Sequence, residues 1–429
     1  MNKFEREQTT TLVERFREPP RSLIIVNGPR QCGKTTVLHQ ALKASQIQHL
    51  YVAVDRMEVN PDLSIENIDS FRVPGAPEDY FAEPRVNQAD AEWLIRVWQE
   101  ARAKADQSEY GYILALDEIQ KIPNWSEIVK GQWDEDQKEG RNMHVVLLGS
   151  APLLMQQGLN ESLAGRFEII RLNHWSFSEM AAAFDFDLDK FIYFGGYPKS
   201  ALLIDNEDRW RNYILDALVN TSIERDILAL QRIDKPVLLK RLFEVGSTFS
   251  GQELSYTKML GSLQDAGNTT TLARYLDLMS QVKLISGLSK FSSNLLRRGS
   301  SPKLIVHNTA LMSASSGYTF EEAKSDRTFW GRLVESAVGA HLLNSLSPRA
   351  ELSYWRKDNF EVDFVVARAN HLSAIEVKSG SQRIRTKGID KFEEIFSNRT
   401  RSINRLGIGG SGTELAEFLA TPASEQVEG

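Results

Sequence analysis

The chain has 429 residues, of which 41% are hydrophobic and 25% are charged, and its formal net charge is −6. A single core rarely grows beyond about 250–300 residues, so this length predicts several domains, and the apolar content excludes general disorder. The negative net charge excludes an overall electrostatic attraction to nucleic acid, so a DNA contact would need a local basic surface.

Cysteine usage and hydropathy bear on the location of the protein. Cys32 is the only cysteine, so no intrachain disulfide can form, which favours a reducing compartment. The first residues, MNKFEREQTT, lack the apolar stretch of a secretory signal. Because there is also no run of about 18 apolar residues, we expect a cytoplasmic protein that does not bind membranes.

The first 175 residues alternate short apolar runs with helix-compatible stretches. Each run is too short for a buried helix and is bounded by Gly, Asp or Asn, which is typical of buried parallel strands. We therefore predict a doubly wound α/β domain with strands over residues 23–26, 50–54, 112–116, 145–148 and 169–172. Residues 71–84 are rich in proline and acidic side chains and predict a loop inside this domain.

A phosphate-binding pattern directly follows the first of these runs. It matches the P-loop spacing GxxxxGK[ST] in full and precedes a helix that we expect to begin near Thr35. Backbone N–H groups of such a loop, with the helix N-terminus, surround phosphates. We expect Lys34 to reach the β- and γ-phosphates of ATP and the Thr35 hydroxyl to bind Mg²⁺. The predicted nucleotide contacts are Gly28, Pro29, Arg30, Gln31, Cys32, Gly33, Lys34, Thr35 and Thr36.

Two adjacent carboxylates, Asp117 and Glu118, end the third apolar run. We expect Asp117 to bind Mg²⁺, directly or through water, and Glu118 to polarise the attacking water. Such a pair can also cap a helix. Its occurrence downstream of a P-loop favours the catalytic interpretation.

Two further polar residues are candidates for a part in hydrolysis. Ser150 follows the fourth strand, where it would orient the attacking water or form a simple turn. Arg166 precedes the fifth strand, where it would serve as an arginine finger for a neighbouring subunit or form a local salt bridge.

The middle of the chain has a helical pattern from residue 176, interrupted by the turn sequence Gly195-Gly196-Tyr197-Pro198. Further on, Asn268 is suited to cap a short amphipathic helix over residues 268–276, which follows another helix and a turn at Gly267. This spacing is typical of a helix-turn-helix or winged-helix unit, and equally of a helical packing module.

A second candidate site lies near the C-terminus. We predict strands over residues 303–307, 360–367 and 374–377, and an amphipathic helix over 329–343. Asp363 should lie beside Glu376, and Lys378 should share a strand face with Glu376. With Glu335 on the helix, these residues would bind Mg²⁺ and activate water, as in nucleases. The same residues could instead form an ion network in a domain that does not cut DNA.

A basic run follows Lys378 and would contact a DNA backbone, unless it is an ordinary solvated helix face. The run comprises Arg383, Arg385, Lys387, Lys391, Arg399, Arg401 and Arg405, interrupted by Asp390, Glu393 and Glu394. The polar tail that follows, residues 421–429, is expected to be frayed.

Several motifs together resemble the bacterial and archaeal AAA+-like P-loop ATPases of the AAA_14/DUF4143 family. The resemblance covers nearly the whole chain and rests on the segments NGPRQ (27–31), LDEIQKIPNW (116–125), GS (149–150), SLAGR (162–166), GGYP (195–198) and IERDI (223–227). It implies an ATPase core, a small winged-helix-like region and a terminal domain similar to PD-(D/E)XK nucleases. The chain departs from the family at Asn308, where such chains usually carry Asp.

We therefore predict five segments: an AAA+-like ATPase core over residues 1–175, a helical lid over 176–232, a winged-helix-like region over 233–300, an α/β nuclease-like domain over 301–420 and a tail over 421–429. The expected activity is Mg²⁺-dependent ATP hydrolysis that drives the remodelling of DNA, in a helicase- or translocase-like manner, by a homo-oligomer. The alternative is a nucleotide-dependent switch that binds a protein partner and carries a degenerate nuclease-like domain. Nuclease activity stays open.

Overall fold

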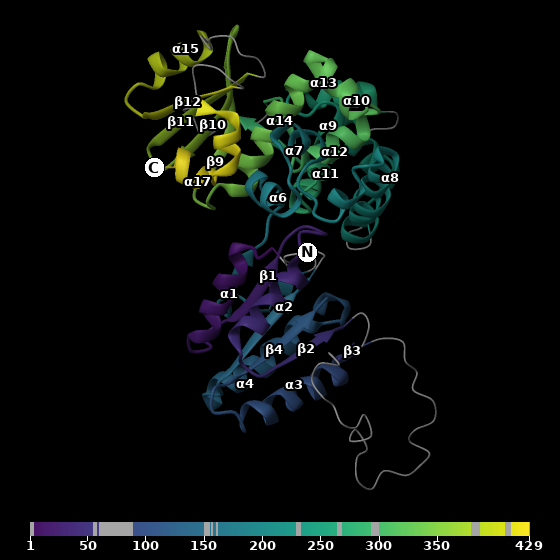
Figure 1. The fold of residues 1–429 in the computed structure, drawn as a ribbon, viewed down its shortest axis with the longest axis vertical. Coiled ribbons are helices and arrows are strands. Elements are labelled where there is room, and N and C mark those ends of the chain that lie inside the picture. Colours follow the sequence, from purple (N-terminus) through teal and green to yellow (C-terminus); the bar gives the residue numbers. More distant parts are fainter. Residues whose placement is uncertain are drawn as a thin grey trace. The chain divides into compact units, whose positions relative to one another are not determined.

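A computed structural model describes residues 4–54, 58–59, 89–149, 155, 158–159, 162–228, 233–263, 268–292, 300–378, 387–407 and 413–428. These residues form two compact units (Figure 1). The N-terminal unit comprises Glu5–Gly28 and Gly33–Leu172. The C-terminal unit comprises Asn173–Gly429 together with Met1–Phe4 and, from the phosphate loop, Pro29–Cys32. The predicted loop at residues 71–84 lies outside the described ranges.

The N-terminal unit contains a six-stranded sheet with the order β3-β2-β4-β5-β1-β6. Its strands are β1 (Leu23–Asn27), β2 (His49–Ala53), β3 (Glu58–Val59), β4 (Tyr112–Asp117), β5 (Met143–Leu148) and β6 (Phe167–Arg171). All strand pairs are parallel except the edge pair of β2 and β3. The five predicted strands are confirmed. Strand β5 lies between β1 and β4, so a single strand separates the strand before the phosphate loop from the strand that ends in the carboxylates.

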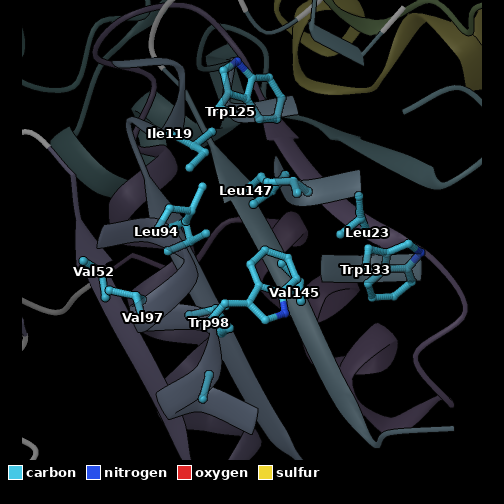
Figure 2. Close-up of a cluster of buried hydrophobic side chains, with 14 of the residues drawn as sticks. Leu23, Val52, Leu94, Val97, Trp98, Ile119, Trp125, Trp133, Val145 and Leu147 are labelled. Carbon is cyan, nitrogen blue, oxygen red and sulfur yellow. The ribbon is translucent and has the colours of Figure 1, made fainter. Parts of the chain in front are cut away.

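Helices cover both faces of this sheet (Figure 1). They are α1 (Glu7–Arg17), α2 (Lys34–Ser45), α3 (Ala91–Ala105) and α4 (Trp125–Glu139). On one face of the sheet, every second strand residue packs against α3 and α4. Trp98 of α3 and Trp133 of α4 belong to the same buried cluster as Val145 and Leu147 of β5 (Figure 2). Buried side chains of this size contribute about 1.5–3 kcal/mol each, so this cluster anchors the strands that carry the site.

Apart from the strands Ile285–Lys290 and Lys303–Val306, the C-terminal unit is helical as far as Ser325. It contains α6 (Phe177–Phe184), α7 (Leu188–Phe194), α8 (Glu207–Asn212), α9 (Pro236–Thr248), α10 (Tyr256–Ser262), α11 (Thr269–Gln281), α12 (Thr309–Ser316) and α13 (Phe320–Ser325), with π-helical turns over Tyr213–Asn220 and Ser222–Leu228. The predicted turn after Phe194 is confirmed, because Gly195 has a φ of +69° that favours glycine.

Within the described ranges, no helix has the length and apolar character needed to cross a membrane.

The predicted helix after Asn268 is also confirmed. The Asn268 side chain caps α11 by accepting a hydrogen bond of 2.8 Å from the backbone N–H of Thr271. Helices α9 to α11 precede an antiparallel hairpin of β7 (Ile285–Lys290) and β8 (Lys303–Val306). The predicted boundary at residue 300 therefore falls between two strands of one hairpin.

The end of the chain forms a seven-stranded sheet with the order β13-β12-β11-β10-β9-β7-β8. Its remaining strands are β9 (Glu351–Lys357), β10 (Phe360–Arg368), β11 (His371–Lys378), β12 (Thr400–Gly407) and β13 (Thr413–Glu414). The helices of this part are α14 (Arg327–Ser345), α15 (Lys387–Phe396), α16 (Leu415–Ala420) and α17 (Ala423–Val427). The chain thus contains the three predicted strands and the predicted helix, each one to three residues longer or shorter at its ends.

The expectation of a frayed tail is wrong. Residues Ala423–Val427 form helix α17, and Ala423 and Val427 are buried. The Glu428 carboxylate accepts hydrogen bonds from the backbone N–H and the hydroxyl of Ser347. Two buried apolar side chains and a paired carboxylate fix a segment whose composition alone suggested fraying.

Candidate nucleotide-binding site

The phosphate loop connects the buried strand β1 to the N-terminus of α2. Gly33 has a φ of +94° and Gln31 a φ of +62°, so two residues of this short loop adopt left-handed backbone conformations. Left-handed turns of this kind turn successive N–H groups inward, and Gly33 adopts its angle without a Cβ penalty. The predicted start of the helix near Thr35 is confirmed, because α2 begins at Lys34.

Lys34 and Thr35 occupy the first turn of α2. The Lys34 ammonium donates a hydrogen bond of 2.9 Å to the carbonyl oxygen of Gly28, at the beginning of the loop. The Thr35 hydroxyl donates a hydrogen bond of 2.7 Å to Asp117 Oδ2. The structure therefore brings the hydroxyl and the carboxylate predicted to bind Mg²⁺ into direct contact.

The Asp117 carboxylate has a second partner that sequence reasoning missed. The phenol of Tyr51 on β2 donates a hydrogen bond of 3.0 Å to the same Oδ2 atom. Asp117 is buried and ends a strand whose six residues are all buried, so its direction is fixed. A hydroxyl and a carboxylate oxygen in contact are hard oxygen donors of the kind that Mg²⁺ prefers. The residues present thus fit a magnesium ion.

Glu118 follows Asp117 in a strained conformation, with a φ of +59°. A left-handed conformation at a residue other than glycine costs free energy and is often found at functional sites. The amide of Gln120 donates a hydrogen bond to Glu118 Oε2. A Cβ on Gly149 would approach Gln120 Oε1 to 2.6 Å, so the glycine after β5 makes room for this amide. Gln120 therefore helps to hold the carboxylate predicted to polarise water.

The middle of the phosphate loop is held by residues of the C-terminal unit, to which Pro29–Cys32 belong. The Arg30 guanidinium forms a bidentate ion pair with Asp226, with Nε–Oδ2 and Nη2–Oδ1 distances of 2.6 and 2.5 Å. The indole of Trp175 donates a hydrogen bond of 2.9 Å to the Cys32 carbonyl oxygen. A bidentate pair restricts both partners, so Arg30 and Asp226 fix this part of the loop.

Arg166 lies at the amino end of β6, whereas the phosphate loop follows the carboxyl end of the neighbouring strand β1. Strands β1 and β6 are parallel and pair Leu23 with Phe167, whereas the loop follows Asn27. Five residues of strand span about 13 Å, which excludes a contact between Arg166 and the nucleotide of its own chain. The guanidinium instead forms a bidentate ion pair with Asp134 of α4, which raises the pKa of Arg166. Ser150 lies outside the described residues.

The four residues of the second candidate site also come together. Glu376 Oε1 lies 2.7 Å from the Lys378 ammonium, which confirms that the two share a face of β11. Asp363 Oδ2 accepts a hydrogen bond of 2.8 Å from the N–H of Val377, so Asp363 is adjacent to Glu376 as predicted. Glu335 of α14 is joined to Asp363 through a residue that sequence reasoning missed, Lys303 of β8.

A β-bulge on β10 explains this grouping. The register of β10 against β9 shifts between Val362 and Val365. The Lys303 ammonium lies 3.6 Å from the Asp363 carboxylate and 5.0 Å from the centroid of the Phe364 ring, so two consecutive side chains face it. Bulges redirect side chains in this way beside functional sites. Strict strand alternation would have placed Asp363 and Phe364 on opposite faces.

The ammonium of Lys303 dominates the electrostatics of this cluster. Burial alone would lower the pKa of Lys303, but Glu335 and Asp363 raise it above the usual range. Burial and the neighbouring Asp363 raise the pKa of Glu335 and that of Glu376, and the lysines oppose this shift. The carboxylates around Lys303 thus favour its charged form.

These residues do not fit a divalent metal. In the part of the chain that the structure describes, no group of three or more His, Cys, Asp and Glu side chains is arranged to hold a metal ion. Two unit charges 4 Å apart repel by about 4 kcal/mol near a protein surface, and a divalent ion beside Lys303 would experience twice that. The Lys303 ammonium would therefore compete with a metal ion at the predicted metal-binding set of Glu335, Asp363, Glu376 and Lys378.

The basic run after Lys378 is partly neutralised where it is described. Lys391 pairs with Glu394 at 2.8 Å, and Arg405 approaches Asp390 at 3.6 Å. Pairs of this kind are typical of a solvated helix face. Arg383, Arg385 and the side chain of Arg401 lie outside the described residues.

Comparison with protein families assigns most of the chain. Residues 20–181 match the model of an AAA domain, AAA_14, and residues 330–411 match a domain of unknown function, DUF4143. The chain belongs to the AAA+-like P-loop ATPases that carry a C-terminal DUF4143 domain. Between these two regions, residues 185–322 of this AAA+-like ATPase match a further domain of unknown function, DUF8612.

Solved structures similar to this AAA+-like ATPase include the Walker-type ATPase Paby2304 of Pyrococcus abyssi. The two are 14% identical with a TM-score of 0.47, over 73% of this chain and 95% of the other. The RuvB Holliday junction branch migration motor of Thermotoga maritima is 16% identical with a TM-score of 0.29, over 66% and 89% of the two chains. These values assign no activity to this chain. A comparison with curated proteins finds no significant match.

Asn308, the departure from the family pattern, keeps a structural role. Its side chain caps α12 by accepting a hydrogen bond from the N–H of Ala310, and it accepts another from the N–H of Gly196. Its amide lies 3.3 Å from Nδ1 of His174. The residue therefore joins the Gly-Gly-Tyr-Pro turn to α12, and the substitution preserves the cap.

Proposed function

We propose that this AAA+-like protein binds ATP with Mg²⁺ and hydrolyses it at the site formed by the phosphate loop and the end of β4. The direct hydrogen bond between Thr35 and Asp117 carries the proposal, because it joins the two motifs that must act on one nucleotide. When bound, Mg²⁺ would neutralise charge on the phosphates, and Thr35 and Asp117 would hold it. Lys34 would leave the Gly28 carbonyl oxygen and contact the phosphates.

Glu118 would position the attacking water and accept its proton. The Gln120 amide holds this carboxylate, so the strength of that hydrogen bond sets how readily Glu118 turns toward water. Ser150 remains a candidate for orienting the same water. Arg166, which lies at the other end of the strands from the phosphate loop, would stabilise the transition state in the neighbouring subunit of a homo-oligomer.

We further propose that ATP turnover drives the remodelling of DNA. Helices α9 to α11 and the hairpin of β7 and β8 follow each other in the order of a winged helix, which supports a DNA-binding unit. The alternative is a nucleotide-dependent switch that binds a protein partner. The paired charges of Lys391 and Arg405 favour this alternative, because they weaken the basic run as a phosphate-binding surface.

Steady-state ATP turnover tests both proposals together. The purified chain is measured alone and with single-stranded, duplex and branched DNA, at low and at physiological salt. Stimulation by one DNA structure that persists at physiological salt supports DNA remodelling. Turnover that no DNA changes supports the protein switch, and the absence of turnover under every condition contradicts the hydrolase.

A further inference from the structure

We propose that Lys303 is the resident cation of the carboxylate cluster in the C-terminal domain, in the position where a PD-(D/E)XK nuclease would bind its metal. The family resemblance implies a nuclease-like domain with a metal ion among its carboxylates. In this structure the ammonium of Lys303 already lies among these carboxylates. The proposal concerns the C-terminal domain alone and does not depend on ATP hydrolysis.

The placement of Lys303 is enforced from several directions. Its Nζ lies 2.5 Å from Glu335 Oε1, 3.6 Å from Asp363 Oδ1 and 3.8 Å from Glu361 Oε1. It also donates a hydrogen bond of 3.2 Å to the Asp363 carbonyl oxygen and lies over the Phe364 ring. Only 1% of the Lys303 side chain is exposed, so its ammonium is enclosed by these groups.

The remaining oxygen donors are also engaged or isolated. Asp363 Oδ2 accepts a hydrogen bond from the N–H of Val377, and Glu376 Oε1 pairs with Lys378. Among the fully buried side-chain oxygens of this cluster that the structure describes, only Glu376 Oε2 lacks both a hydrogen bond and an ion pair. A single carboxylate oxygen is a poor ligand set for Mg²⁺, which requires several oxygens in octahedral geometry. Lys303 therefore satisfies charges that a metal would otherwise balance.

This arrangement makes two variants informative. Lys303→Met removes the ammonium and keeps an unbranched side chain, so the carboxylates of Glu335 and Asp363 lose their counter-charge. Lys378→Met removes the half-exposed ammonium on the same cluster and is the matched control, because Lys303 remains. Both are made in full-length chains that carry Asp117→Asn, so that the candidate magnesium ligand of the N-terminal unit does not contribute.

The measurement is Mn²⁺ binding by these nucleotide-free chains, followed by electron paramagnetic resonance. We expect no saturable binding to the Asp117→Asn chain or to its Lys378→Met derivative. The Lys303→Met derivative should bind Mn²⁺ saturably, with an affinity on the order of tenfold or more above the upper limit that the other two chains set. Addition of Glu335→Gln should remove the gain. Equal Mn²⁺ affinity with and without Lys303 would overturn the proposal.

If the Lys303→Met chain does not fold, a second measurement without this variant tests the proposal. The Asp117→Asn chain is then compared with its Asp363→Asn derivative for Mn²⁺ binding and for cleavage of DNA with Mn²⁺. The proposal expects no binding and no cleavage in either chain. Saturable Mn²⁺ binding or cleavage that Asp363→Asn abolishes would show a working metal site and contradict Lys303 as its occupant.

Discussion

The phenol of Tyr51 donates a hydrogen bond of 3.0 Å to Asp117 Oδ2, the oxygen that also accepts from Thr35. Tyr51 lies on β2, where it pairs with Ala115 of the neighbouring strand β4. The strand register thus delivers a buried hydroxyl to the carboxylate that would hold Mg²⁺. Two donors on one oxygen fix the direction of the carboxylate and leave its other oxygen for additional partners.

Tyr51→Phe should therefore weaken the magnesium site without disturbing the fold. Loss of a group that orients a metal ligand typically costs 10–100-fold in metal affinity or activity, so we expect ATP turnover to fall by about tenfold. The Mg²⁺ concentration for half-maximal turnover should rise. Tyr110→Phe, at a side chain that is 79% exposed, is the control. An unchanged Mg²⁺ dependence of Tyr51→Phe would argue against a role of the phenol.

Asp226→Ala should destabilise the C-terminal unit. The change leaves the Arg30 guanidinium without its bidentate partner, and Asp226 itself has only 2% of its side chain exposed. Breaking a fully buried pair costs about 3–5 kcal/mol, and the partial exposure of Arg30 reduces this to about 2 kcal/mol. Urea unfolding followed by circular dichroism measures the loss. Asp216→Ala, an exposed position of the preceding π-helical turn, should change stability little.

Arg166→Ala should leave ATP affinity unchanged and lower turnover, because the residue cannot reach its own nucleotide. Arginine fingers contribute about 10³–10⁵ to the rate, so a large loss is expected. Mixed oligomers of an Arg166→Ala chain with a Glu118→Gln chain should regain activity, since some sites then combine an intact Glu118 with an intact Arg166. Mixtures as inactive as either variant would limit Arg166 to its ion pair with Asp134.

Buried neutral histidines should make the protein less stable in acid. Burial lowers the pKa of His341 from 6.5 to about 4, and a hydrogen bond to the Thr421 backbone only partly opposes this shift. The folded state then binds fewer protons than the unfolded state between these two pKa values. Stability is therefore lost as the pH falls through this window, by about 2 kcal/mol between pH 7 and pH 5.

Urea unfolding of the wild type and of His341→Leu at several pH values isolates this contribution. His144 and His307, whose pKa values are also lowered by burial, are present in both proteins. The wild type should therefore lose more stability than His341→Leu as the pH falls from 7 to 5. Parallel profiles would mean that His341 has the same pKa in the folded and unfolded states, which contradicts the shift.

The sequence predicted the features that depend on neighbouring residues. The phosphate loop is one contiguous motif, and the buried strands of the N-terminal unit are apolar runs whose period and length exclude helices. Asp117 and Glu118 follow such a run directly. These positions needed no knowledge of the tertiary structure.

Features that depend on distant residues were missed. Tyr51 reaches Asp117 from a strand 66 residues earlier, and Arg30 meets Asp226 across 196 residues. Lys303 looked like the first residue of an ordinary strand, and only the bulge in β10 turns Asp363 and Phe364 toward it. For one of these contacts the sequence contained a signal. The segments that contain Arg30 and Asp226 are both motifs that resemble the family.

ATP binding and ATP turnover, measured side by side on the wild type, Lys34→Ala and Glu118→Gln, test the central claim most directly. Lys34→Ala should weaken ATP binding by about a hundredfold, because a charged contact to phosphate is worth about 1.5–3 kcal/mol. Lys43→Ala, at an exposed position near the end of α2, is its control. Glu118→Gln should bind ATP like the wild type and turn it over at least about a hundredfold more slowly. Wild-type turnover by Glu118→Gln, or unchanged ATP affinity of Lys34→Ala, would contradict the proposed hydrolytic site.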